Sequence, residues 1–255
     1  VMAGPQRKSR IMSDEERRVT AYHETGHALV AAALPHTDPV HKVTIMPRGR
    51  ALGYTMVLPD DDKYSTTRNQ LLDQLAYSLG GRAAEELVFH DPSTGASNDI
   101  EKATSLARAM VTQYGMTEAI GAIKLGSDAS QPFFGRDYSH PREYSESVAA
   151  TVDEEIRKLI ENAHQEAFDI LVANRDIMDR MTVELLEKET LGKEEIAEIF
   201  KKIKKMDARP AWTGSPRRAP SFRPPVDIPE RKVVVETPAP AVEKPRRTRK
   251  PKSSE

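Results

Sequence analysis

Two histidines stand four residues apart in the stretch AYHETGHALVAAALP, residues 21–35, and a glutamate directly follows the first of them. Residues with this spacing lie on one face of an α-helix, so the imidazoles of His23 and His27 can reach the same ion. Glu24 is turned by about 100° around the helix axis, where it can accept a proton from metal-bound water without binding the metal itself. The motif therefore predicts a helix that carries two zinc ligands and a general base.

The alternative is that two histidines fell on a stable helix by chance. At ordinary residue frequencies this string occurs in about one chain of this length in a hundred. Unpaired histidines that face a core would be costly, and the face that they share is small or apolar, with Val19, Gly26, Val30 and Ala31. A glycine in mid-helix costs about 1 kcal/mol relative to alanine, so we expect something to approach the backbone at Gly26.

Hydrophobic periodicity predicts a mainly α fold with one small β element. The first helix is expected to begin at a capping box formed by Ser13 and Glu16 and to end before Pro35. Alternating residues on either side of a glycine-containing connection predict a β-hairpin within residues 42–58. Further helices are expected at residues 66–89, 98–114, 143–174, 175–188 and 193–205, and the last three would form a C-terminal helical bundle.

A catalytic zinc needs a third protein ligand, and two carboxylates are candidates. Glu86 falls on the apolar face of its predicted helix, whereas Glu85 is expected to point the other way, and a core-facing acid needs a partner. Asp99 opens the next helix, where it could place a ligand or simply suit the positive end of the helix dipole. Periodicity favours Glu86 but leaves the choice open. The other five histidines are expected at the surface.

Composition limits what else the chain can do. It has no cysteine, which excludes disulfides, thiolate zinc ligands and thiol catalysis. The longest apolar run, residues 28–34, is far shorter than the ~20 residues of a membrane helix. Residues 208–255 contain ten of the eighteen prolines and carry a net charge of +7, so a disordered, Pro-rich basic tail is expected there.

Three blocks, AYHETGHALVA, GGRAAEELVF and STGASNDIEKATSLARAMVTQYGM, resemble in order and spacing the peptidase domain of FtsH-type AAA+ zinc metalloproteases. The resemblance extends over most of residues 1–205. It implies that His23, His27 and Asp99 bind one zinc ion per chain and that Glu24 activates the attacking water. Glu86 would then orient a ligand histidine. The implied organisation is a linker at residues 1–12, a zinc peptidase domain at 13–207 and the tail at 208–255.

The same resemblance implies a homo-hexamer behind an ATPase ring on the cytoplasmic side of a membrane. The ATPase would use ATP to unfold substrates, and a membrane segment would precede it. Neither is expected within these residues, because no G-x-x-x-x-G-K-[ST] string occurs and no apolar run is long enough. The linker would then come from the ATPase domain outside this sequence. The piece itself should be soluble.

Zinc-dependent cleavage of unfolded polypeptides is the predicted function, and an extended substrate is expected to add to a strand edge. The residues nominated for that edge are Gly53, Tyr54, Thr55 and Met56. The alternative function is a ring-forming assembly module with weak or no activity in isolation, suggested by the long charged helices after residue 143. The basic tail could touch anionic lipid, but a solubilising role is favoured and nucleic acid is not an expected partner.

Overall fold

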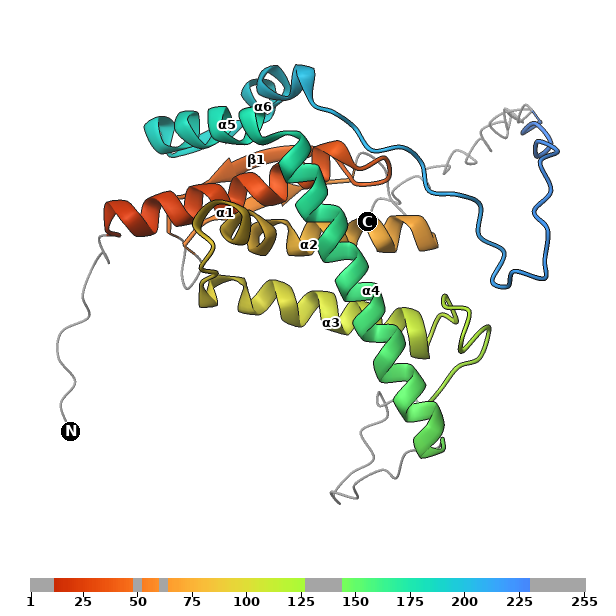
Figure 1. The fold of residues 1–255 in the computed structure, drawn as a ribbon. Helices are drawn as coiled ribbons and strands as arrows, with labels where there is room; N and C mark the ends of the chain where they lie inside the picture. The colour runs from red at the N-terminus through yellow and green to blue at the C-terminus, as the bar shows by residue number, and fades with distance from the viewer. Residues whose placement is uncertain (1–11, 48–51, 60–63, 127–143, 230–255) are drawn as a thin grey trace, which may run out of the picture. The chain divides into compact units, whose positions relative to one another are not determined.

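The computed structural model describes residues 12–47, 52–59, 64–126 and 144–229. Within these ranges the chain is mainly helical with one small antiparallel sheet, which confirms the predicted fold class (Figure 1). The helices are α1 (Asp14–Ala33), α2 (Arg68–Phe89), α3 (Ser97–Thr112), α4 (Glu146–Ala173), α5 (Arg175–Lys188) and α6 (Lys193–Ile199). The strands are β1 (Val40–Thr44), β2 (Tyr54–Val57) and β3 (Thr190–Gly192), and short 3₁₀ turns occupy Thr94–Ala96 and Phe200–Lys202.

Local sequence signals set the ends of the first two long helices. Ser13 and Glu16 form the predicted capping box at the start of α1, with the Glu16 amide 3.1 Å from the Ser13 hydroxyl. Thr67 and Gln70 form a second capping box at the start of α2. The helix α1 ends at Ala33, two residues before Pro35, as predicted.

The sheet has the strand order β2-β1-β3, and both pairings are antiparallel. The predicted hairpin is β1 with β2, in which Lys42 pairs with Met56 and Thr44 with Tyr54. The third strand was not predicted: Leu191 pairs with Val43, although the two residues are far apart in the sequence. As the first strand in this order, β2 lies at the edge of the sheet.

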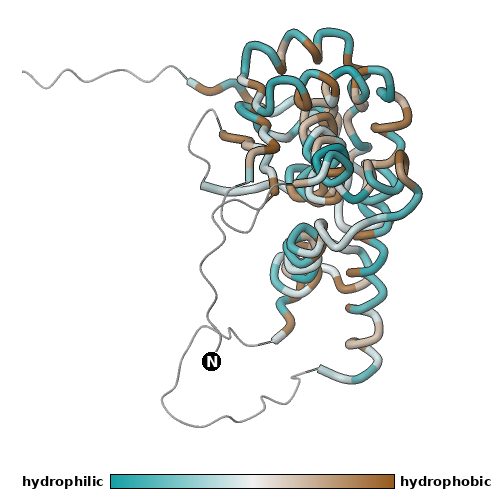
Figure 2. Tube along the Cα trace, turned by 90° about the vertical axis from the view of Figure 1, so that its left-hand side faces the viewer, coloured by the Kyte–Doolittle hydropathy of each residue, from teal (hydrophilic) through white to brown (hydrophobic). Residues whose placement is uncertain are grey.

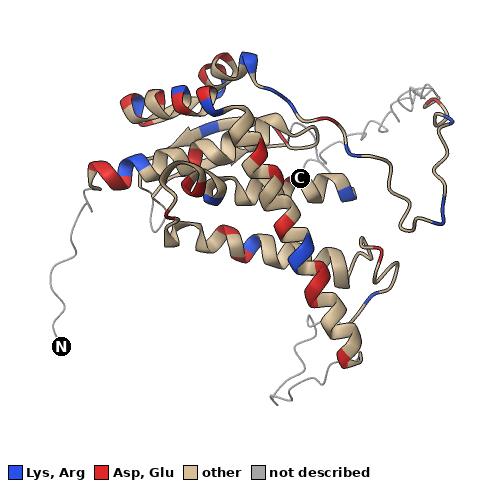
Figure 3. Ribbon diagram, in the orientation of Figure 1, with Lys and Arg blue, Asp and Glu red and all other residues tan. Residues whose placement is uncertain are grey.

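The core lies on both sides of α1. Leu29 and Val30 face a large apolar cluster shared with α2, α3, α4 and the start of α5, whereas Ala28 and Ala31 face a smaller cluster formed with the sheet, α5 and α6. Apolar and hydrophilic residues alternate along the helices, and acidic and basic residues recur along α4 and α5 (Figures 2 and 3). The helix that carries the histidine pair is therefore enclosed along most of its length.

The segment that follows α6 packs along the domain, and we call residues 203–212 the C-terminal strap. Asn174 accepts a hydrogen bond from the Lys204 amide at 2.7 Å and donates one to the Lys204 carbonyl at 3.1 Å. Arg209 pairs with the buried Asp73 and, at 2.5 Å, with Glu166. The Arg68 guanidinium lies 4.4 Å from the ring centre of Trp212.

The strap overlaps the start of the predicted tail. Residues 208–255 were expected to be disordered, and in the part of them that the structure describes, residues 208–229, there is no helix or strand, although Arg209 and Trp212 contact the domain. Proline content suggested disorder, but it does not reveal that Arg209 neutralises a buried acid or that Trp212 meets Arg68. The linker at residues 1–12, apart from its last residue, and the tail from residue 230 onward lie outside the described residues. No helix in the described ranges is long and apolar enough to cross a membrane.

Candidate metal centre

The two motif histidines and Asp99 converge on one point. The Nε2 atoms of His23 and His27 lie 3.1 Å apart, and Asp99 Oδ2 is 3.3 Å from the first and 3.4 Å from the second. These three residues offer donor atoms that all lie within 4.8 Å of one another. Two imidazole nitrogens and one carboxylate oxygen suit a zinc ion and leave a fourth position open for water or substrate. The residues present therefore fit the predicted metal.

Hydrogen bonds to α2 fix the orientation of both imidazoles. His27 Nδ1 lies 2.8 Å from the carbonyl oxygen of Tyr77, which can only accept, so Nδ1 carries the proton and the Nε2 lone pair faces the site. His23 Nδ1 lies 2.7 Å from Glu85 Oε1. Both rings thus turn the same nitrogen toward Asp99.

Glu85 also connects the histidine helix to the segment that presents Asp99. Its second oxygen, Oε2, accepts a hydrogen bond from the Ser93 amide at 2.5 Å. Ser93 caps the short turn Thr94–Ala96, which runs directly into α3 and Asp99. One buried carboxylate therefore holds a histidine with one oxygen and the loop before Asp99 with the other.

The prediction that Glu86 faces the core and Glu85 points away was wrong. Glu85 is 1% exposed, whereas Glu86 is partly exposed and pairs with Arg82 at 2.6 Å and His164 at 2.9 Å. The reason is that α2 packs against α1 on one side and against α3 and α4 on others, so the apolar face alone does not show which acid meets α1. Glu86 contacts neither of the two motif histidines.

Glycines on α1 and α2 allow the close approach on which the site depends. A Cβ atom at Gly26 would lie 2.4 Å from the Gly80 carbonyl oxygen, and one at Gly80 would lie 2.8 Å from the Gly26 carbonyl oxygen. A Cβ at Gly81 would lie 2.4 Å from His23 Nε2. The expectation that something approaches the backbone at Gly26 is confirmed. The adjacent glycines of α2 would have been the signal in the sequence, because Gly81 precedes Glu85 by one helical turn.

The nominated edge strand lies against Glu24, which is 7% exposed. The Thr55 hydroxyl is 2.8 Å from Glu24 Oε2, and a Cβ at Gly53 would lie 2.9 Å from Glu24 Oε1. Tyr54 extends toward Lys42, whose Nζ lies 5.9 Å from its ring centre. Met56 pairs with Lys42 across the hairpin. The sequence had not indicated the contact between this strand and Glu24.

The electrostatics of the cluster favour charge on its members. Burial lowers the pKa of His23, but hydrogen bonds to Asp99 and Glu85 outweigh it and raise that pKa to about 9. Burial raises the pKa of Asp99, but hydrogen bonds from the two histidines hold it well below its usual value. Burial and the nearby charges of Glu24 and Asp99 raise the pKa of Tyr77 to about 12, so its phenol stays protonated at neutral pH. A proton on His23 and a metal ion at its Nε2 are alternatives.

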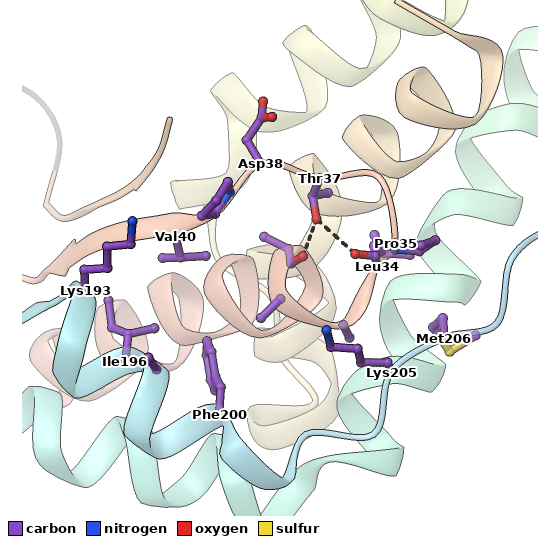
Figure 4. Close-up of a pocket in the computed structure, with 15 residues that line it drawn as sticks. Leu34, Pro35, Thr37, Asp38, Val40, Lys193, Ile196, Phe200, Lys205 and Met206 are labelled. Carbon is purple, nitrogen blue, oxygen red and sulfur yellow. Dashed lines mark hydrogen bonds between the residues drawn. The ribbon is translucent and has the colours of Figure 1, made fainter. Parts of the chain in front are cut away.

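The structure also contains a cavity of about 510 Å³ at the C-terminal end of α1 (Figure 4). Val40, Ile196 and Phe200 line it, and the side chains of Lys193 and Lys205 stand at its sides. Thr37 closes the turn beside it through hydrogen bonds to the carbonyl oxygens of Ala31 and Leu34. None of the predicted site residues lines this cavity. The group formed by His23, His27 and Asp99 is therefore the better candidate for the functional site.

Two histidines and a glutamate on one helix, with a carboxylate brought to the histidines by another helix, are the arrangement of the helical metallopeptidases of the HExxH class. Within that class, residues 10–199 match peptidase family M41, and the chain belongs to this family.

Relatives carry the name ATP-dependent zinc metalloprotease FtsH. The one from Cutibacterium acnes is 60% identical over 97% of this chain and 34% of its own length. The one from Mycobacterium tuberculosis H37Rv is 48% identical over 90% of this chain and 30% of its own length. The one from Rubrobacter xylanophilus is 52% identical over 78% of this chain and 31% of its own length. The chain thus spans about a third of the length of these relatives.

Family membership confirms the resemblance to FtsH-type peptidases that the three sequence blocks indicated. The predicted zinc metallopeptidase activity and the predicted zinc cofactor are also confirmed, by the family and by the names of the relatives.

Proposed function

We propose that this chain is a zinc endopeptidase in which His23, His27 and Asp99 hold the metal and Glu24 is the general base. The observation that carries the proposal is the convergence of three donor atoms within 4.8 Å, beside a glutamate that is almost fully buried. A carboxylate enclosed next to a metal is well placed to take a proton from the attacking water.

The chain's own residues prepare the reaction. When bound, zinc polarises the scissile carbonyl and lowers the pKa of a water molecule to about 7. Glu85 and the Tyr77 carbonyl hold the Nδ1 atoms of the two histidines, so that both Nε2 lone pairs remain directed at the metal. Glu24 accepts the proton of the attacking water and passes it to the leaving amine, as microscopic reversibility allows.

Unfolded polypeptides are the proposed substrates. An extended chain would pair with β2, the strand at the sheet's edge that lies against Glu24. Main-chain hydrogen bonds to residues 53–56 would then bring a peptide bond to the metal with little dependence on side chains. Gly53, Tyr54, Thr55 and Met56 are therefore the proposed substrate-binding residues.

The larger assembly belongs to the same proposal. The relatives are named ATP-dependent, and this chain spans about a third of their length. We propose that the full-length protein adds an ATPase that unfolds substrates, forms a homo-hexamer and is anchored to a membrane with the peptidase on the cytoplasmic side. Glu16 and Arg17 at the start of α1 would then follow the linker from that ATPase.

Exchanging Glu24 for Gln tests the base. The zinc-loaded Glu24→Gln chain should cleave casein or a fluorogenic peptide about 10²–10⁴-fold more slowly, because the amide cannot accept the proton. Zinc content should stay at one per chain. Glu15→Gln, an exposed glutamate on the same helix, is the matched control and should keep full activity. Undiminished cleavage by Glu24→Gln would overturn the proposal.

Exchanging Asp99 for Asn tests the third ligand. Asp99→Asn should lose most of its zinc by atomic absorption, because the neutral amide is a poor ligand. The alternative function, a ring-forming assembly module, instead predicts no cleavage by the parent chain and a hexamer in sedimentation with or without zinc. The hydrogen bond that holds the Glu24 carboxylate favours the enzyme, because an assembly module has no use for an oriented buried carboxylate.

A further inference from the structure

The edge strand and the general base are joined by a side-chain hydrogen bond. The Thr55 hydroxyl lies 2.8 Å from Glu24 Oε2 and 3.0 Å from the Glu24 backbone carbonyl. A hydroxyl has one proton to donate, and an ionised carboxylate is the stronger acceptor, so the bond to Oε2 is favoured. The bond fixes one oxygen of a carboxylate that is 7% exposed.

A second contact with Glu24 is made by Gly53, the residue directly before β2. A Cβ atom at Gly53 would lie 2.9 Å from both Cγ and Oε1 of Glu24 and 2.7 Å from the Thr44 carbonyl oxygen. Only glycine lets the chain pass this close without moving the glutamate or the strand β1. Glu24 is therefore confined by Thr55 of β2 and by Gly53, which directly precedes that strand.

The strand is in turn held to the metal site through Tyr77. The Tyr77 hydroxyl lies 3.4 Å from the Thr55 carbonyl oxygen, while the Tyr77 backbone carbonyl accepts the hydrogen bond of the ligand His27. The Tyr77 ring also packs against His27, with ring centres 5.5 Å apart. Contacts thus run from Glu24 through Thr55 and Tyr77 to His27.

We infer that Thr55 is a positioning residue for the general base, and that a substrate pairing with β2 contacts the strand that orients Glu24. The inference rests on the proposed function, because it assigns to Glu24 the role of base. It adds a second task to the edge strand: besides receiving the substrate, the strand holds the base through the Thr55 hydroxyl.

Three exchanges at Thr55 test the hydroxyl. Thr55→Val keeps the shape and removes the donor, and should lower kcat by about 10–100-fold with an unchanged KM, as loss of a partner that orients a reacting group does. Thr55→Ser keeps the donor and should stay within about threefold of the parent kcat, because a serine hydroxyl makes the same bond. Zinc content should be unchanged in both variants.

A readout apart from activity is the side-chain position of Glu24. Crystal structures should show the Glu24 carboxylate displaced in Thr55→Val and in place in Thr55→Ser. Thr190→Val is the matched control, because Thr190 loses a hydroxyl bonded at 2.8 Å to Thr44 in the same sheet but makes no bond to Glu24. Its kcat should match the parent.

The outcomes separate this inference from the proposed function. Full activity in Glu24→Gln would overturn the proposed function itself. An inactive Glu24→Gln together with a Thr55→Val whose kcat is within twofold of the parent would overturn the inference alone. If Thr55→Val does not fold, Thr55→Ala replaces it, and equal kcat values for Thr55→Ala and Thr55→Ser would overturn the role of the hydroxyl.

Discussion

Two acids on α2, Asp73 and Glu85, are similar in burial and in the kinds of contact they make, but they lie in different parts of the domain. They are 0% and 1% exposed, and each accepts a backbone hydrogen bond from a loop, from the His36 amide at 2.8 Å and the Ser93 amide at 2.5 Å. Each also faces a basic side chain, Arg209 for Asp73 and His23 for Glu85. Asp73 binds Arg209 of the C-terminal strap, and Glu85 binds His23 of the candidate metal site.

The difference lies in the basic partner. An arginine keeps its charge at every pH at which a protein is folded and does not bind metal ions, so the cation beside Asp73 does not change. A histidine can exchange a proton for a metal ion. The Glu85 carboxylate can therefore pair either with protonated His23 or with His23 bound to a metal ion. The comparison predicts that changes at Asp73 affect stability and that changes at Glu85 affect zinc.

The largest expected effect is at Asp73. Asp73→Ala should lower the free energy of unfolding by about 3 kcal/mol, because the His36 amide and part of the Arg209 charge lose their buried acceptor. Urea unfolding of the zinc-loaded chain measures it. Zinc stoichiometry should be unchanged. A loss below about 1 kcal/mol, or a loss of zinc, would contradict the division between the two acids.

Next in size is the effect at Glu85. Glu85→Gln should weaken zinc binding about 10–100-fold, because His23 loses the charged acceptor that orients its ring and makes it a better ligand. Competition with a chromophoric chelator measures the affinity. Glu86→Gln is the control and should bind zinc like the parent, since Glu86 pairs with Arg82 and His164. A larger effect at Glu86 would reverse the assignment.

The pH dependence should distinguish the two pairs as well. In the zinc-free chain the pKa of His23 is raised to about 9, so its stabilising contribution is complete below about pH 6.5 and disappears as the pH rises toward 9. Zinc competes with that proton, so zinc affinity should rise with pH over the same window, by up to about tenfold per pH unit.

Calorimetry in buffers of different ionisation enthalpy tests this at pH 7, where about one proton should be released per zinc bound. Zinc binding without proton release at that pH would show that His23 is already neutral.

The smallest expected effect is at the end of the strap. Trp212→Leu should lower the free energy of unfolding by about 0.5–1 kcal/mol, because the Arg68 guanidinium loses the aromatic face that lies 4.4 Å away. Thermal unfolding measures it, with zinc binding as the control that should not change. An effect as large as that of Asp73→Ala would mean that the ring, and not the ion pair, fastens the strap.

Local features of the fold could be predicted because their causes are local. The capping box at Ser13, the stop at Pro35 and the spacing of His23 and His27 all act within a few residues. The sequence alone could not select Asp99, because nothing near it distinguishes a ligand from an acid that suits a helix start. Resemblance to a known family selected it, and the structure brings it to within 3.4 Å of both histidines.

The remaining features depend on distant partners. The strand β3 has three residues, too few for a periodic pattern, and it exists because Leu191 pairs with Val43. Glu85 differs from Glu86 only in which neighbouring helix each one meets. Arg209 joins the domain because a buried acid on α2 needs a cation. In each case the cause lies more than a hundred residues away, or on another helix.

The strand order β2-β1-β3 has a consequence for how the chain is made. Within the domain, Glu24 and Thr55 are synthesised before Thr190–Gly192, which pairs with β1, the strand that also pairs with the strand of Thr55. Domains generally fold as units once their residues have emerged. We therefore expect a chain that ends before Thr190–Gly192 to carry the whole HETGH motif without the complete sheet that packs beside it.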